Sequence, residues 1–277
     1  MTVLTPGAAR HWVNGQECGQ LNVTDRGLTF GDGVFETLRI AAGRARFLGL
    51  HWQRLRLGCE RLQIHGVDYA ELETHLRAAA ATVADGMAKL IVTRGPSHRL
   101  GYAPEAVGSP TRILTLYPGV AAWPPTARVL FSAVSLGENP QLAGLKHLNR
   151  LENVLARAAL PADCEEALLC SVQGPVICGT SSNVFIVLAG ELCTPLLNRC
   201  GVAGIMRRLV LREAAAAGVT VREQLLTRAD LQDAAEIFLT NARVGVWPVS
   251  KIANQALAVG PVTAALKFRI EALDGSS

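Results

Sequence analysis

The sequence predicts a mixed α/β (α+β) fold divided into two domains. Strand-like segments alternate with segments of helical periodicity over most of the 277 residues, as in mixed α/β proteins. Residues 118–127 hold three prolines and no clear period, and we interpret them as a linker because proline fixes φ and removes a backbone donor. The composition, 49% hydrophobic and 18% charged, is that of a globular protein. We therefore expect a small N-terminal α/β domain (1–117) and a larger C-terminal α/β domain (128–277).

Each element follows from its local pattern. In the first part, short runs rich in β-branched and aromatic residues predict strands, and apolar residues at helical spacing, such as Leu55 and Leu62, predict helices. The strands are expected at 12–15, 35–40, 89–95 and 112–118, the helices at 51–64 and 69–84, and a glycine-rich turn at 30–35. In the second part, strands are expected at 128–134, 166–172, 183–189 and 236–240, and helices at 147–160, 204–217 and 262–273.

Composition also limits the function. The net charge of +4 is spread along the chain, which disfavours a nucleic-acid or membrane-surface partner. No apolar run reaches the ~18 residues that a membrane span needs, and the start lacks the pattern of a signal peptide. The seven cysteines form no CxxC pair and are expected to be reduced and mostly buried. The six histidines lack metal-ligand spacing, so we expect no structural metal. Because neither a membrane span nor a signal peptide is expected, we predict a cytoplasmic protein.

One lysine is conspicuous. The chain has 27 Lys+Arg, of which four are lysines: Lys89, Lys146, Lys251 and Lys267. Lys146 lies in LAGLKHLNRLENVLA (142–156), where a loop leads into a predicted helix. A desolvated lysine with a lowered pKa can form a Schiff base with a carbonyl. The alternative is a plain charge near a helix N-terminus, although a cation there opposes the helix dipole. Lys146 is therefore the best candidate for a nucleophile.

Two further stretches suggest a phosphate site. GVAGIMRRLV (201–210) is a glycine-rich turn that runs into a helix, so the backbone N–H groups of Ile205 and Met206 could hold a phosphate. In LTNARVG (239–245), Thr240 and Asn241 could reach the same phosphate, or could belong to an ordinary polar loop. A Schiff-base lysine combined with a phosphate site indicates pyridoxal 5′-phosphate (PLP) as the cofactor.

The motifs FGDGVFETLR, HWQRL, LAGLKHLNRLENVLA, SSNVF, GVAGIMR and TNARVGVWPV, in this order over roughly residues 10–250, resemble those of fold-type IV PLP enzymes. That family includes branched-chain and D-amino-acid aminotransferases and 4-amino-4-deoxychorismate lyases. AGLKHLNRLE, with Arg150 where the aminotransferases more often carry tyrosine, is most similar to the lyases. The resemblance implies a two-domain, D-amino-acid/branched-chain aminotransferase-like fold, a homodimer, and cleavage of 4-amino-4-deoxychorismate to 4-aminobenzoate and pyruvate in folate biosynthesis.

The resemblance also implies residue roles. Lys146 would carry the cofactor and move the proton. Arg54, in the His51–Leu55 pattern, would bind the cofactor phosphate together with Ile205, Met206, Thr240 and Asn241. Arg99 in PSHRLGY (96–102), a loop one residue longer than the family's, would bind a substrate carboxylate. The implied substrate contacts are Arg99, Tyr102 and Phe30. Glu36 and Asp32 could contact substrate or hold a turn, and for Asp32 we expect the turn.

The clearest departure from the family is Cys178. In PVICGTSSNVF (175–185) it takes the position of the glutamate that pairs with the pyridine nitrogen, and the next acidic residue, Glu191, lies beyond the strand. A thiol is a weak partner for a pyridinium, so we expect a weaker electron sink. Elimination suffers less than transamination, because the electrons can leave with a departing group. Two alternatives stay open, namely a branched-chain or D-amino-acid aminotransferase and a non-catalytic degenerate homologue.

Overall fold

The computed structural model describes residues 8–105 and 108–273. These residues form two compact units. The first comprises the described residues up to Ala122 together with Lys146–Asn149, and the second comprises Trp123–Leu145 and residues 150–273. The break after Ala122 falls in the proline-rich segment 118–127. The short stretch around the candidate lysine, however, returns to the first unit.

The first unit is built on a six-stranded antiparallel sheet in the order β2-β1-β6-β5-β3-β4. Three helices accompany it, and the predicted helices 51–64 and 69–84 correspond to the two longer ones. The strands are β1 (Arg10–Val13), β2 (Gln16–Glu17), β3 (Gly33–Ala41), β4 (Arg44–Ala45), β5 (Asp85–Thr93) and β6 (Thr111–Pro118), and the helices are α1 (Arg26–Phe30), α2 (Leu48–Arg61) and α3 (Tyr69–Ala80).

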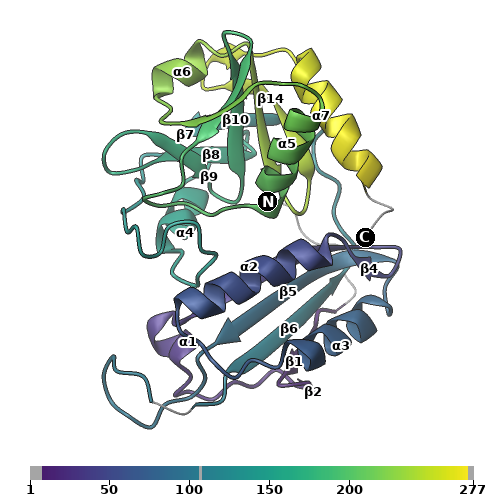
Figure 1. Cartoon of the computed structure of the whole chain (residues 1–277), viewed down its shortest axis with the longest axis vertical. Helices are drawn as coiled ribbons and strands as arrows, with labels where there is room; N and C mark the ends of the chain where they lie inside the picture. Colours follow the sequence, from purple (N-terminus) through teal and green to yellow (C-terminus); the bar gives the residue numbers. More distant parts are fainter. Residues whose placement is uncertain (1–7, 106–107, 274–277) are drawn as a thin grey trace. The chain divides into compact units, whose positions relative to one another are not determined.

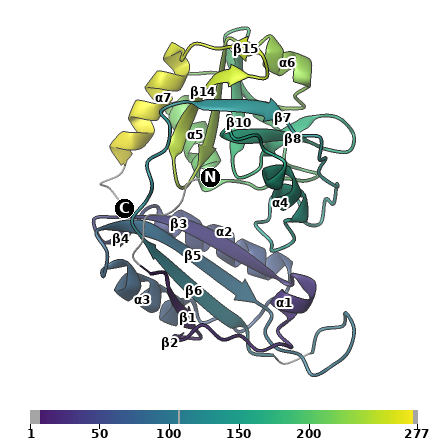
Figure 2. The same cartoon turned by 180° about the vertical axis from the view of Figure 1, so that it is seen from behind.

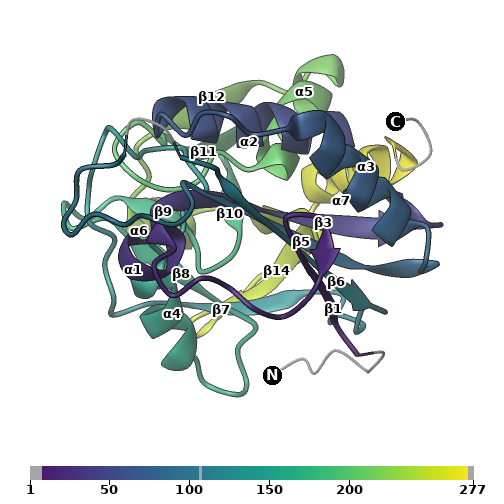
Figure 3. The same cartoon turned by 90° about the horizontal axis from the view of Figure 1, so that it is seen from below.

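Helices α2 and α3 cover the same face of this sheet (Figure 3). Side chains alternate along β3, so Val34, Glu36 and Leu38 are buried on the helix-covered face. Phe35 and Thr37 point to the opposite face and are only partly buried. This alternation puts the side chains of Glu36 and Phe35 on opposite faces of β3.

The second unit holds a nine-stranded mixed sheet in the order β12-β11-β10-β13-β14-β7-β8-β9. The short β15 pairs with β14 and lies beside it in Figure 2. Helices α5 and α7 pack on each other and on β13 (Figure 1). The strands are β7 (Ala127–Phe131), β8 (Glu166–Cys170), β9 (Val176–Gly179), β10 (Asn183–Leu188), β11 (Glu191–Pro195), β12 (Val221–Gln224), β13 (Glu236–Asn241), β14 (Gly245–Ile252) and β15 (Gln255–Ala256), and the helices are α4 (Leu151–Ala158), α5 (Ile205–Ala216), α6 (Arg228–Gln232) and α7 (Pro261–Ala272).

The predicted start of the helix after Lys146 is wrong. We expected a helix over 147–160, but α4 begins at Leu151. The preceding residues run beside β3 instead, where the N–H of Phe35 donates to the carbonyl of Lys146 (2.9 Å) and the N–H of Leu148 donates to Gly33 (3.0 Å). Backbone partners in β3 therefore replace the first helical turn. Lys146 does not lie at a helix N-terminus, and the predicted conflict with the helix dipole does not arise.

The cysteines are free and mostly buried, as expected from the sequence. All seven lie in the described part of the chain as free thiols, and five of them are buried. No helix among the described residues is both long and apolar enough to cross a membrane.

Candidate active-site residues in the two units

The backbone around Lys146 is held on both sides of the lysine. Two residues upstream, Gly144 donates its N–H to Gly201 and accepts from the N–H of Ala203, both at 3.0 Å. At the lysine itself, the carbonyl accepts the N–H of Phe35. The side chain also meets Phe35, with Nζ 4.1 Å from the ring centroid. Lys146 is therefore anchored at both its backbone and its side chain.

Below α2, Glu36 forms a buried cluster with Arg54 and His51. Arg54 donates Nε to Oε1 (2.7 Å) and Nη2 to Oε2 (2.5 Å), and His51 Nδ1 lies 2.6 Å from Oε2. Burial by itself raises the pKa of Glu36, but its two partners outweigh burial and bring the pKa down to about 2. Burial lowers the pKa of His51 and outweighs its hydrogen bond to Glu36. His51 is thus neutral at pH 7, and its Nδ1–H donates to the carboxylate.

This cluster corrects one expectation. Glu36 is 1% exposed and engaged with Arg54, so it neither contacts substrate nor holds a turn, the two roles considered from the sequence. Instead it fixes the orientation of the arginine to which the resemblance assigns the cofactor phosphate. His51 and Arg54 are three residues apart on α2, so their side chains lie on the same face of the helix. Both can therefore reach the one carboxylate of Glu36.

The second unit contains a group of donors suited to an anion. Helix α5 begins after Gly204 without a side-chain cap, which leaves N–H groups of its first turn available. Asn183 Nδ2 donates to the carbonyl of Val202 (2.9 Å), and a Cβ on Gly204 would lie 2.1 Å from Asn183 Oδ1. Thr240 is directly opposite Asn183 in the β10–β13 ladder. Within the described residues its buried Oγ1 has no hydrogen-bond partner.

These observations fit a phosphate, because an uncapped helix N-terminus carries a partial positive charge and a hydroxyl can donate to the same oxygen. The predicted residues Ile205 and Met206 are the first two of α5, and both are buried. Asn241 is used differently, since its Oδ1 accepts the N–H groups of Arg243 and Val244, both at 3.0 Å. That oxygen fixes the turn after β13, which leaves only the amide nitrogen of this side chain for a ligand.

Cys178 lies in β9 and is buried. Burial raises the pKa of its thiol to about 12, although the positive charge of Arg150 acts in the opposite direction. The thiol is therefore neutral at pH 7. Arg150 precedes α4 and donates Nη2 to the carbonyl of Leu145 (2.6 Å). A neutral thiol can form only weak hydrogen bonds, which agrees with the weak partner expected at this position.

Sequence reasoning missed the buried Glu166. Its carboxylate accepts N–H groups of Thr180 (3.0 Å) and Ser181 (3.2 Å), and hydroxyls of Thr180, Ser181 and Ser182. These donors form the turn that follows Cys178. The pairing of β8 with β9 could have pointed to this contact. Leu168 pairs with Gly179 in this antiparallel pair, and the same register continued puts Glu166 opposite Ser181. We expected no nearby acid in place of the family glutamate; Glu166 does lie near enough to Cys178 to act on its thiol, but its oxygens are already engaged in the turn.

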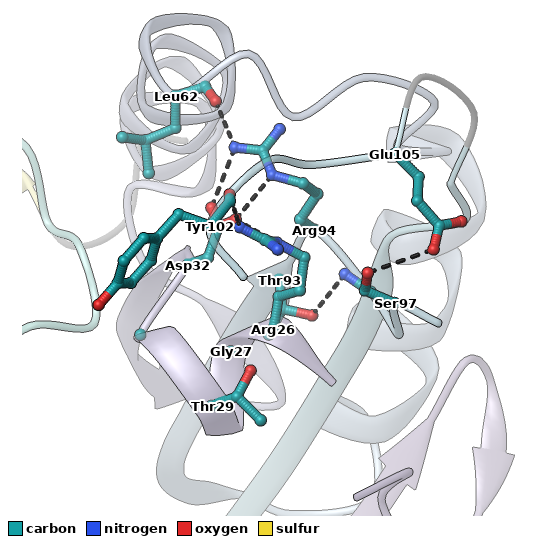
Figure 4. Close-up of polar contacts among 12 residues, drawn as sticks. Arg26, Gly27, Thr29, Asp32, Leu62, Thr93, Arg94, Ser97, Tyr102 and Glu105 are labelled. Carbon is teal, nitrogen blue, oxygen red and sulfur yellow. Dashed lines mark hydrogen bonds and ion pairs between the residues drawn. The ribbon is translucent and has the colours of Figure 1, made fainter. Parts of the chain in front are cut away.

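The predicted substrate residues gather at one end of the first unit. The rings of Phe30 and Tyr102 are in tilted contact, with centroids 5.4 Å apart. Arg99 is exposed, and its N–H donates to Ser97 Oγ (3.2 Å). Asp32 accepts hydrogen bonds from Arg26 and Arg94 (Figure 4), so its predicted role in holding the turn is confirmed.

Residues 33–252 match the profile of the amino-transferase class IV family. The chain belongs to this family. The aminodeoxychorismate lyase of Vibrio harveyi is 35% identical over 248 residues, which cover 87% of this chain and 90% of that protein. The crystal structure of 4-amino-4-deoxychorismate lyase from Pseudomonas aeruginosa is 44% identical, with a TM-score of 0.88 over 95% of this chain and 98% of that one. A D-alanine aminotransferase of Bacillus licheniformis is 30% identical over 264 residues, 89% of each protein.

Membership in the class IV family confirms the predicted resemblance and the mixed α/β, aminotransferase-like fold. The roles of the individual residues stay predictions. The residues themselves are divided between the two units. The first unit contains Lys146, Arg54, Phe30, Arg99 and Tyr102, and the second contains Cys178, Ile205, Met206, Thr240 and Asn241.

Proposed function

We propose that the chain is a PLP-dependent lyase that cleaves 4-amino-4-deoxychorismate to 4-aminobenzoate and pyruvate, a step of folate biosynthesis. The observation that carries the reaction is the 44% identity, over 95% of the chain, to the Pseudomonas aeruginosa lyase. The Vibrio harveyi lyase supports the same assignment at 35% identity.

The residues present suit PLP. Its phosphate would be bound by the start of α5, at Ile205 and Met206, and by the hydroxyl of Thr240, which in the described part of the chain have no side-chain cap and no hydrogen-bond partner, respectively. Arg54 would be the cationic partner. Lys146 would carry the cofactor covalently. When bound, PLP supplies an electron sink for the carbon that bears the substrate amine.

The protein's own part in the reaction falls mainly to Lys146. As general base it takes the proton from the amine-bearing ring carbon. The neighbouring C–O bond then breaks and enolpyruvate leaves, which makes the remaining ring aromatic. The lysine afterwards holds that proton and can return it to the departing group. The neutral thiol of Cys178 supports this direction, because a weak partner favours expulsion of a leaving group over prolonged storage of the electron pair.

An aminotransferase of the same fold is the second candidate, favoured by the similarity to D-alanine aminotransferase. Cys178→Glu separates the two. We expect the substitution to create or raise amino transfer from D-alanine or a branched-chain amino acid while lyase activity persists. If lyase activity is absent both before and after the change, the lyase assignment fails.

We further propose that the enzyme is a cytoplasmic homodimer. The free thiols agree with a reducing compartment, and the dimer is what the resemblance to the family implies. Light scattering on the purified protein measures the assembly: a mass of twice 29.5 kDa is expected, and a monomer at micromolar concentration contradicts it.

The deciding experiment combines a spectrum with peptide mapping. Purified protein with added PLP should show a visible absorbance band, and borohydride reduction should fix the cofactor on the peptide that contains Lys146. Lys146→Arg keeps the charge and should abolish both labelling and the release of 4-aminobenzoate. Protein that stays colourless with PLP would support the non-catalytic alternative, whereas labelling with amino transfer only would support the aminotransferase.

A further inference from the structure

A second network of charges in the first unit surrounds Asp32, in the turn between α1 and β3 (Figure 4). The carboxylate accepts Nε (2.7 Å) and Nη2 (3.0 Å) of Arg94, and Nε of Arg26 at 2.9 Å. Burial raises the pKa of Asp32, but the hydrogen bonds from the two arginines outweigh it and hold the pKa below its ordinary value. Asp32 therefore stays ionised and fixes both guanidinium groups.

Arg94 directs its remaining donors to the framework of the unit. Nη1 donates to the carbonyl of Gln63 and Nη2 to that of Leu62, both at 2.7 Å. These two carbonyls directly follow α2. Arg94 therefore links the end of α2 to the turn at Asp32, and within the described part of the chain its side-chain hydrogen bonds go to these residues and not to the loop 97–105.

Arg26 directs its remaining donors to that loop. The residue is 5% exposed, and its Nη2 donates to the carbonyl of Tyr102 (2.7 Å), with Nη1 3.4 Å from that of Gly101. Its guanidinium also lies 4.8 Å from the ring centroid of Phe30, the ring that packs against Tyr102. One buried cation thus fixes both aromatic residues that the sequence predicts to contact substrate.

The rest of the loop is anchored at its base. Glu105 accepts the N–H of His98 (2.8 Å) and the hydroxyl of Ser97 (3.2 Å), and the N–H of Ser97 donates to Thr24 (3.1 Å). Residues 99–102 have no regular secondary structure. Among the described residues, the hydrogen bonds that reach this tip from outside the loop come from Arg26. Without Arg26, the tip would keep its own short-range hydrogen bonds and the ring contact between Tyr102 and Phe30.

The tip presents a surface suited to a ring that bears a carboxylate. Tyr102 is 84% exposed and Phe30 is 37% exposed, so both can offer ring faces to a flat ligand. Arg99, in the same loop as Tyr102, is also exposed and can pair with a carboxylate. Because the exposed rings of Phe30 and Tyr102 stabilise no hydrophobic core, ligand recognition explains better than packing why a buried ion pair holds them in place.

We propose that Arg26 is a positioning residue for substrate recognition. Fixed by Asp32, it holds the 99–102 tip so that Arg99, Tyr102 and Phe30 meet a cyclic carboxylate. The proposal rests on the proposed lyase function, because 4-amino-4-deoxychorismate is such a substrate. A misplacement of binding groups by about 1 Å can reduce turnover efficiency by as much as ~100-fold.

The test compares Arg26→Gln with the matched control Arg94→Gln. Both variants remove an ion pair with Asp32, but only the first releases the tip. We expect Arg26→Gln to raise KM for 4-amino-4-deoxychorismate by about tenfold with a smaller change in kcat, and Arg94→Gln to leave KM nearly unchanged. Arg26→Lys keeps the charge but not the planar fork, so it should restore part of the affinity.

Limited trypsin digestion provides a readout that needs neither cofactor nor turnover. Cleavage after Arg99 should become severalfold faster in Arg26→Gln than in wild type or Arg94→Gln, at a temperature where all three are folded. Equal cleavage rates and equal KM values in the two variants would overturn the proposal. If the wild-type protein lacks lyase activity, the proposed function fails by itself, and the cleavage contrast still decides whether Arg26 holds the tip.

Discussion

Glu36 in the first unit and Glu166 in the second are each 1% exposed, yet their surroundings differ. Glu36 meets two side chains that carry or can carry positive charge, Arg54 and His51. Glu166 accepts hydrogen bonds mainly from hydroxyls and backbone N–H groups of residues 180–182, and its cationic neighbour Arg157 is exposed and farther away, with Nη1 3.6 Å from Oε1. The first carboxylate orients a charged arginine and a neutral histidine on a helix, whereas the second shapes a turn. Burial alone therefore says little about the role of a glutamate, and its donors decide that role.

The largest effect is expected when Glu36 is removed. Glu36→Ala leaves Arg54 and His51 buried without their shared acceptor, and breaking a buried ion pair in this way costs about 3–5 kcal/mol. Urea unfolding monitored by circular dichroism gives the change in the free energy of unfolding. A loss below about 1 kcal/mol, the range of exposed ion pairs, would contradict the assigned role.

The next largest effect is expected in the pH dependence of stability, which tests the cluster at Glu36. The pKa of Glu36 is lowered to about 2 in the folded protein, so its contribution is present above the unfolded pKa of about 4.5 and is lost as pH falls toward 2. His51, whose pKa is also lowered, takes up a proton more readily when unfolded, so stability falls further below about pH 6.5. The Glu36 contribution is about 3 kcal/mol. Glu36→Gln should flatten the curve between pH 4.5 and 2, and an unchanged slope would refute the assignment.

Glu166→Gln should have a smaller effect on stability. Removal of the charge weakens several charge-assisted hydrogen bonds, at a cost of about 1.5–3 kcal/mol, but the hydroxyls can rotate toward other acceptors. Thermal unfolding of this variant beside Glu36→Ala measures the difference. Equal destabilisation by the two substitutions would contradict the larger stabilising role assigned to Glu36.

The smallest effect is expected in the labelling rate of Cys178, which reports on the turn at Glu166 alone. In the native protein Cys178 should resist iodoacetamide at pH 7.5, because it is buried and the pKa of its thiol is about 12. The half-buried Cys18 serves as the internal reference. Glu166→Gln loosens the turn after Cys178 and should speed its labelling severalfold, while Glu36→Ala should not, provided that the protein stays folded. The same rate in both variants would show that Glu166 does not guard this turn.

The sequence predicts the elements better than the contacts between them. The apolar alternation of β5 and the helical period of α2 are local, and both elements were predicted. The helix after Lys146 starts late because its first residues bond to β3, a tertiary effect that no local period contains. Lys146 was recognisable through the rarity of lysine. Arg26 carried no such signal in a chain rich in arginine, and its partners lie 75 and 76 residues away.

The position of residues 146–149 also has a consequence for synthesis. These residues belong to the first unit although about two dozen residues of the second precede them. On the ribosome, the first unit therefore lacks one of its segments until the chain has grown past Asn149. A fragment that ends at the proline-rich stretch would lack the backbone that pairs with Gly33 and Phe35 of β3, as well as the lysine. The candidate nucleophile thus enters its unit only after synthesis of the second unit has begun.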